Sequence, residues 1–168
     1  MNRTLIMIRH AKSSWANPAQ SDFERPLNER GKKDAPEMGA RLKKAGLIPQ
    51  LIIASTAVRT KETATYIAKQ LGYDVALIRW EDKLYHCLPS ALEEVLYGVK
   101  NSIKSVLIVA HNPGITEFVN QLSPNFFTNN MPTCGVVAAS FEAEKWEDFP
   151  VSKRKVIIFD YPKNEHDS

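Results

Sequence analysis

Short apolar runs alternate with helix-like segments along the whole chain, and this alternation most constrains its fold. The apolar runs are rich in β-branched residues, which is typical of buried strands, and they cover residues 4–8, 50–54, 75–78, 105–110, 136–141 and 156–159. Helices are predicted between them, over residues 28–45, 58–71, 89–97 and 112–122. Strands that alternate with helices favour an α/β fold, here a three-layer sandwich whose mainly parallel central sheet has helices on both faces.

Residues typical of helix ends mark the predicted boundaries. Asn28 is expected to cap the first helix and Gly46 to end it, while Pro36 should kink or interrupt it. Ser55 or Thr56 is expected to cap the second helix. For the fourth helix, Asn112 is the predicted cap and Pro113 the first residue.

The chain is expected to form one domain over residues 1–168. Its 168 residues, 43% of them hydrophobic, can bury one core, and no linker or repeat divides them. No apolar run approaches the roughly 20 residues that span a bilayer, and the first run ends at Arg9-His10 without a cleavage site. Cys87 and Cys134 form no CxxC motif and suggest no disulfide framework. We therefore expect a cytoplasmic protein with no membrane partner.

Positive charge is concentrated in the first part of the chain. The residues up to Lys61 include 12 basic and 5 acidic side chains, whereas the remainder has 10 basic and 14 acidic ones. Such an excess indicates an anion-binding site, a nucleic-acid surface or solvated helix faces. The basic stretches Arg30–Lys33 and Lys43-Lys44 contain no aromatic residue, so they favour a solvated face and no nucleic-acid partner.

Polar and basic residues follow three of the predicted strands, at Arg9-His10, Ser55–Arg59 and His111-Asn112. Ligands of parallel sheets bind at the carboxyl ends of the strands, where helix N-termini also gather. Arg59, in the first turn of a helix, opposes the helix dipole, and a bound anion would reverse that effect. If the strands are neighbours, two imidazoles and two guanidiniums meet in one site. That set suits a dianionic phosphoryl group.

Other phosphate chemistries lack their motifs. A cysteine phosphatase needs an arginine six positions after its cysteine, but Glu93 follows Cys87 and Ser140 follows Cys134 at that spacing. The chain has no GxxxxGK[ST], GxGxxG or HExxH motif. A metal held by His10, His111 and a carboxylate remains an alternative, although no ligand spacing supports it, and we predict neither a metal nor a cofactor.

Four ordered motifs resemble the histidine phosphatase superfamily, and most closely its small SixA-type phosphohistidine phosphatases. They are Arg9–Ser13, Arg25–Gly31, Ser55-x-x-x-Arg59-Thr60-x-x-Thr63-Ala64 and His111–Gly114, within residues 4 to about 120. Many members have glycine after Arg-His, and Ala11 at this position fits the SixA-like branch. The resemblance implies a phosphoglycerate-mutase-like fold and a cofactor-free phosphatase that forms a phosphohistidine intermediate.

By this resemblance His10 attacks phosphorus, while Arg9, Arg59 and His111 hold the phosphoryl oxygens, His111 as an imidazolium or a hydrogen-bond donor. Two further residues, Ser13 and Asn17, are within reach by sequence alone. Arg25 either joins the phosphate site or pairs with a nearby acidic residue, Asp22 or Glu24.

The general acid and the substrate stay open. Related mutases and broad phosphatases use a glutamate before the third helix, and Asp82 fits that place by its spacing to Tyr85. Glu81 is its neighbour, and a phosphohistidine phosphatase could work without a strong acid. The expected substrate is a phosphorylated protein or peptide, most simply protein phosphohistidine. The alternatives are a small phosphomonoester and a non-catalytic phosphate-binding module.

Overall fold

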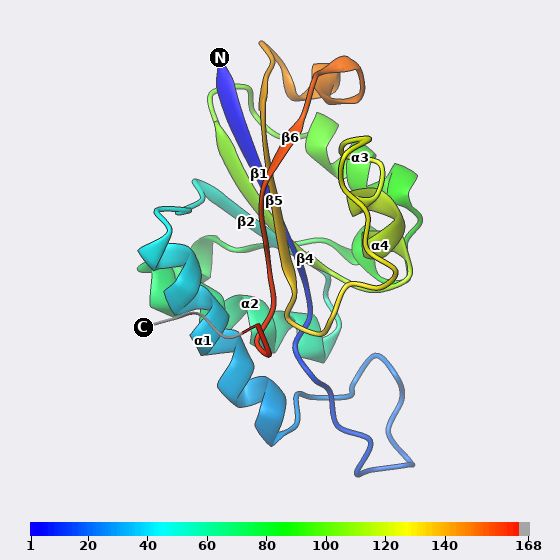
Figure 1. Cartoon of the computed structure of the whole chain (residues 1–168). Helices are drawn as coiled ribbons and strands as arrows, with labels where there is room; N and C mark the ends of the chain where they lie inside the picture. Colours follow the sequence, from blue (N-terminus) through cyan, green and yellow to red (C-terminus); the bar gives the residue numbers. More distant parts are fainter. Residues whose placement is uncertain (165–168) are drawn as a thin grey trace.

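The chain forms three layers around a central sheet (Figure 1). The computed structural model describes residues 1–164, so that His166 lies outside the described part. Six strands lie in the order β3-β2-β4-β1-β5-β6. Their bounds are β1 Asn2–Arg9, β2 Leu51–Ala54, β3 Arg79–Trp80, β4 Ser105–Ala110, β5 Val136–Glu142 and β6 Lys155–Asp160. Strands β1 to β4 are mutually parallel, β5 is antiparallel to β1, and β6 is antiparallel to β5, which confirms the predicted mainly parallel sheet.

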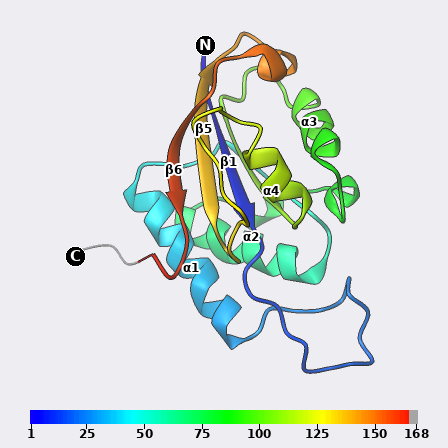
Figure 2. The same ribbon diagram turned by 45° about the vertical axis from the view of Figure 1, so that its right-hand side comes forward.

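Two pairs of helices cover the two faces of the sheet (Figure 2). The helices α1 (Glu29–Lys44) and α2 (Val58–Leu71) pack on one face, and α3 (Pro89–Tyr97) and α4 (Gly114–Val119) pack on the other. Successive side chains of a strand point to opposite faces. Accordingly Leu5 and Met7 of β1 join the core under α3 and α4, while Ile6 and Ile8 join the core under α1 and α2.

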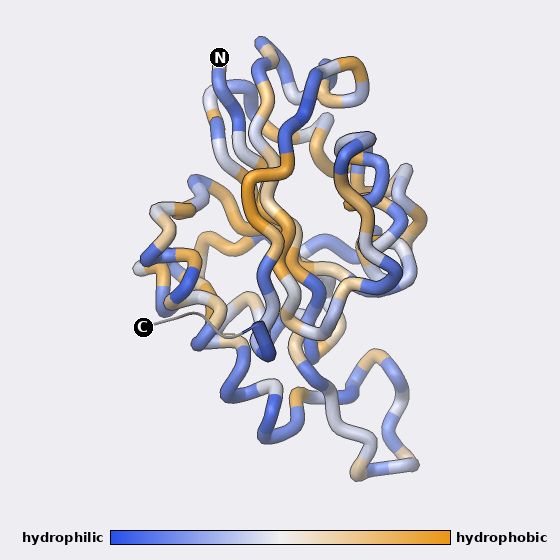
Figure 3. The backbone as a smooth tube through the Cα atoms, in the orientation of Figure 1, coloured by the Kyte–Doolittle hydropathy of each residue, from blue (hydrophilic) through white to orange (hydrophobic). Residues whose placement is uncertain are grey.

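Both cores are apolar, and the strands between them form a hydrophobic centre (Figure 3). All four residues from Leu5 to Ile8 are fully buried, as a strand covered on both sides requires. None of the described helices has the length and apolar character needed to cross a membrane.

The expected strand over residues 75–78 is wrong. Residues Val75–Leu77 form a short 3-10 helix, and β3 begins two residues later, at Arg79. The Asp74 carboxylate accepts a hydrogen bond from the Ala76 amide at 3.0 Å, which closes a turn instead of extending the chain. Leu77 is 65% exposed while its neighbour Ile78 is buried, so the segment is only partly covered.

The predicted starts of α2 at Val58 and α3 at Pro89 are confirmed, but the expected side-chain caps are correct at only one of three places. Asn28 caps α1, because its side chain accepts from the Gly31 amide, and α1 continues past Pro36 without a break. The carbonyl that Pro36 leaves unpaired belongs to an exposed residue, Lys32, where water can replace the lost bond. The caps expected at Ser55 or Thr56 and at Asn112 are wrong: α2 and α4 begin without a side-chain cap.

The three polar junctions do meet. In the sheet β1 and β2 flank β4, with Arg9 beside Ala110 and Ala54 beside Val109 at their carboxyl ends. Backbone pairing extends past the strands, because the His10 amide donates to the Ala110 carbonyl at 3.1 Å. The sheet therefore brings His10, Ser55 and His111 to one edge.

Candidate active site

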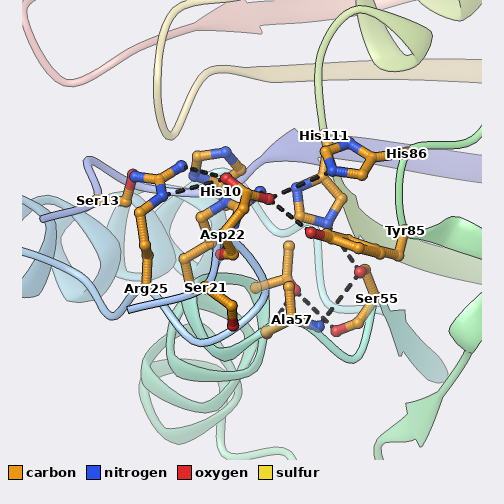
Figure 4. A network of polar contacts seen from close by, with 12 residues as sticks. His10, Ser13, Ser21, Asp22, Arg25, Ser55, Ala57, Tyr85, His86 and His111 are labelled. Carbon is orange, nitrogen blue, oxygen red and sulfur yellow. Dashed lines mark hydrogen bonds and ion pairs between the residues drawn. The ribbon is translucent and has the colours of Figure 1, made fainter. Parts of the chain in front are cut away.

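A cavity of about 260 Å³ opens at the carboxyl ends of β1, β2 and β4. Figure 4 shows much of its polar network. Four cationic side chains and one carboxylate line it, together with three histidines. The lining residues are Arg9, His10, Lys12, Ser13, Trp15, Asp22, Arg25, Arg59, His86, His111, Asn112 and Thr133. A larger hollow of about 720 Å³ lies between α1 and β6, but its lining contains no histidine or cysteine. Three of the four histidines of the chain line the smaller cavity instead.

His10 is a neutral imidazole, and one of its two ring nitrogens already forms a hydrogen bond within the protein. Its Nδ1 lies 2.7 Å from the Ala11 carbonyl oxygen, which can only accept, so Nδ1 carries the proton and Nε2 keeps its lone pair. Burial, and then the positive charges of Arg59 and Arg9, lower the pKa of His10 from 6.5 to about 3, although the bond to Ala11 acts the other way. At neutral pH, His10 is therefore a potential nucleophile.

Arg9 and Arg59 bring two guanidiniums to the cavity with incomplete pairing. Arg59 is 3% exposed and donates to the backbone carbonyl and carboxylate of Asp22, at 2.7 and 3.0 Å. Arg9 donates to the Met131 carbonyl at 2.8 Å, and burial and then the charge of Arg59 lower its pKa. Within the described residues, the Nε atoms of both arginines are buried without a protein partner. Two such cations close together favour a bound anion.

His111 lies beside His10, with ring centroids 5.3 Å apart. Its Nε2 is 2.8 Å from the Ser55 hydroxyl, and its buried Nδ1 has no partner in the described part of the chain. Burial, and then the neighbouring His10 and Arg59, lower the pKa of His111 from 6.5 to about 2. His111 is therefore neutral near pH 7, and of the two expected forms the hydrogen-bond donor fits better than the imidazolium.

The loop between β1 and α1 places one carboxylate among the cations. Asp22 accepts from Arg25 at 3.0 Å and from Tyr85 at 2.6 Å, in addition to Arg59. Its partial burial raises its pKa, but the hydrogen bonds from Tyr85, Arg25 and Arg59 lower it well below the ordinary range. Asp22 therefore stays ionised and holds the guanidiniums in place. Of the two alternatives for Arg25, the structure shows the pairing with Asp22, and the same side chain also lines the cavity.

Arg25 links this network to the outer rim of the cavity. Its guanidinium donates to the Ser13 hydroxyl and lies 3.7 Å from the centre of the Trp15 ring. Trp15 is 75% exposed, although it lines the cavity. A large aromatic surface is thus held at the entrance by a buried cation.

Two predicted residues do not line the cavity. The Asp82 carboxylate accepts from the Thr56 hydroxyl at 2.7 Å in an exposed position, and the side chain of its neighbour Glu81 contacts Arg79 at 3.5 Å. Asn17 lies in the exposed loop, where its side chain accepts from the Ala19 amide. The other predicted residues, Arg9, His10, Ser13, Arg25, Arg59 and His111, come together in the cavity.

Several lining residues received no site role from the sequence, among them Trp15, Asp22 and His86. Asp22 was considered only as an ion-pair partner of Arg25. The one signal for His86 was its rarity, since it is one of four histidines and precedes a helix that begins at Pro89.

The cavity offers no evident metal site. Among residues 1–164 no three histidine, cysteine, aspartate or glutamate side chains are arranged to hold a metal ion. A neutral imidazole with a free Nε2, surrounded by arginines, can instead attack an electrophilic phosphorus whose oxygens the cations hold.

Comparison with known proteins points to one family. The sequence pattern of the histidine phosphatase superfamily (branch 1) matches residues 5–83. The structure is similar to that of SixA from Agrobacterium tumefaciens, with a TM-score of 0.80 and 25% identity over 95% of this chain and 98% of that one. The structure is also similar to that of the protein histidine phosphatase SixA complexed with tungstate. Here the TM-score is 0.81, with 20% sequence identity over 96% of this chain and 98% of that chain. An uncharacterized protein of Mycobacterium tuberculosis is 30% identical over 93% of this chain and its own full length.

Proposed function

Because this chain belongs to branch 1 of the histidine phosphatase superfamily, we propose that it removes the phosphoryl group from a phosphorylated protein, with His10 as nucleophile. One observation carries the proposal: the carbonyl of Ala11 fixes the proton of His10 on Nδ1, so the lone pair of Nε2 is available beside the arginines.

The reaction has two steps. His10 Nε2 attacks phosphorus, the bond to the leaving group breaks, and the phosphoryl group is transferred to His10. Arg9, Arg59 and His111 hold its oxygens as charge develops on them. Water then attacks the phosphorus of phospho-His10, which releases inorganic phosphate and restores the neutral imidazole. No metal or cofactor takes part in this proposal.

The preferred substrate is phosphohistidine on a protein or peptide. A cavity of about 260 Å³ accommodates a phosphoryl group but leaves the body of a protein substrate outside. The exposed ring of Trp15 at the entrance offers that body an aromatic contact. Similarity to SixA, which is described as a protein histidine phosphatase, supports the same substrate class.

The test compares wild type with His10→Ala on a phosphohistidine peptide and on para-nitrophenyl phosphate. We expect wild type to release phosphate from both and His10→Ala to lose about 10⁴-fold or more in kcat/KM. Rapid acid-free quenching with a ³²P-labelled peptide should trap label on wild type and none on the variant. Equal phosphate release by the two proteins would exclude His10 as the nucleophile.

A second comparison separates protein substrates from small esters. The kcat/KM for the phosphohistidine peptide is measured beside those for free phosphohistidine and a sugar phosphate. A preference for the peptide supports the proposed substrate class, whereas a preference for the sugar phosphate would favour a small-molecule phosphatase. Phosphate binding without turnover of any of the three would favour the non-catalytic module.

A further inference from the structure

His86 differs from the other two histidines of the cavity in its exposure. His10 and His111 are 7% and 3% exposed, whereas the side chain of His86 is 58% exposed and still lines the cavity. Its Nε2 lies 3.3 Å from Asp22 Oδ2, and its ring packs against Tyr85 at a centroid distance of 4.0 Å. In the view of Figure 4, the Asp22 side chain lies between His10 and the pair formed by His86 and His111. His86 is thus an imidazole at the entrance, placed by a carboxylate.

The backbone at His86 has an unusual conformation. Its φ of 52° lies in the left-handed region, which costs free energy for a residue with a side chain and persists where the surroundings impose it. The next residue is closely packed: a Cβ on Gly114 would lie 2.2 Å from the Cys87 carbonyl oxygen. The segment with His86 is therefore packed directly on the start of α4, where only glycine leaves room.

An alkyl phosphate needs a proton carrier at the entrance, because its alkoxide leaving group is strongly basic. The leaving group stays attached to the substrate body outside the cavity, so the bond that breaks faces the entrance. Asp22 is ionised and cannot donate, and His111 is buried and neutral with its pKa lowered to about 2. An imidazole near neutral pH can both give and take a proton.

We propose that His86 is the catalytic residue that protonates the leaving group and then takes the proton from the attacking water, with Asp22 as its positioning residue. The proposal rests on the phosphatase function above. In the first step the P–O or P–N bond breaks, its electron pair stays on the leaving atom, and the His86 imidazolium gives that atom a proton. In the second step water bonds to phosphorus, the P–N bond to His10 breaks, and the water proton restores the His86 imidazolium.

The test uses substrates whose leaving groups differ in their need for a proton. His86→Asn removes the imidazole but keeps a residue that tolerates positive φ. We expect kcat/KM to fall about 10²–10⁴-fold for an alkyl phosphate and less than about tenfold for para-nitrophenyl phosphate, whose leaving group is stable as an anion. Lys12→Gln is the matched control, because it removes another exposed cation of the same cavity. Its effect should be the same on both substrates.

Chemical rescue provides an independent readout. His86→Gly removes the backbone strain and leaves room for added imidazole. Imidazole should raise the alkyl phosphatase activity of this variant at least tenfold, and it should leave the activity of His10→Ala unchanged. Equal losses on the two substrates for His86→Asn, or no restoration by imidazole, would overturn the role of His86. Full activity of His10→Ala would instead overturn the proposed function, so the two failures are distinguishable.

Discussion

The floor and the rim of the cavity are built in different ways. The floor consists of residues at the strand ends and the start of α2, namely Arg9, His10, Arg59 and His111. The rim consists of residues from two irregular segments, namely Trp15, Asp22, Arg25 and His86. Backbone pairing of neighbouring strands places Arg9, His10 and His111, and the first turn of α2 places Arg59. Side-chain contacts that converge on Asp22 place most of the rim.

This difference separates two tasks. A floor fixed by sheet register gives a preorganised site for the phosphoryl group, as electrostatic stabilisation of a transition state requires. A rim held by one carboxylate and an exposed aromatic ring is suited to contacts with the part of the substrate that lies outside. Substitutions in the two regions should therefore affect different kinetic constants.

The largest difference is expected between Arg59→Ala and Arg25→Ala. Loss of Arg59 removes a floor cation beside the reacting group and should lower kcat on para-nitrophenyl phosphate about 10²–10³-fold, as for loss of one oxyanion donor. Loss of Arg25, a rim cation, should lower kcat on the same substrate only about tenfold. Arg59→Lys, which keeps the charge without the fork, should be intermediate. Similar kcat losses for both alanine variants would contradict the division into floor and rim.

The Asp22→Asn variant should bind inorganic phosphate about tenfold more tightly than wild type. The Asp22 carboxylate contacts the same guanidiniums that would bind phosphate, so its removal takes away a competing negative charge. The inhibition constant of inorganic phosphate measures this effect, and the same variant should have a lower kcat because Arg59 and His86 lose their shared partner. Weaker phosphate inhibition would mean that Asp22 mainly preorganises the cations.

The sequence predicted the whole floor but only Arg25 of the rim, for a physical reason. A residue that follows a buried strand has its position set by the strand, so His10 and His111 could be placed at the same edge of the sheet from the apolar runs, and together if their strands were neighbours. Asp22 and His86 follow no strand, and their places depend on contacts between distant segments, such as the packing of Cys87 on Gly114. The same limit explains Asp82, whose spacing fitted a family position but whose side chain contacts Thr56 outside the cavity.

Low pH should destabilise the folded protein because of the two buried histidines of the floor, His10 and His111. In the folded protein the pKa values of His10 and His111 are lowered from 6.5 to about 3 and about 2, respectively. Below pH 6.5 the unfolded chain therefore binds protons at these two histidines that the folded chain does not bind. The free energy of unfolding should therefore fall as the pH falls from about 6.5 towards 3. His10→Asn should flatten this dependence, as measured by urea denaturation at several pH values. The paired carboxylate Asp22 adds a loss only at lower pH, so an unchanged slope in His10→Asn would contradict the assignment of the effect to the floor.

Trp15→Ala should have the smallest effect and should separate substrate classes. Its ring lies at the entrance against Arg25 and does not reach the floor, so kcat for para-nitrophenyl phosphate should change less than about twofold. KM for a phosphohistidine peptide should rise about five- to tenfold, because an exposed aromatic contact contributes about 1 kcal/mol. Trp15→Phe, which keeps an aromatic surface, is the matched control. An equal rise in KM for the peptide and for free phosphohistidine would show that the ring acts through Arg25 on the phosphoryl group, and the rim would then belong functionally to the floor.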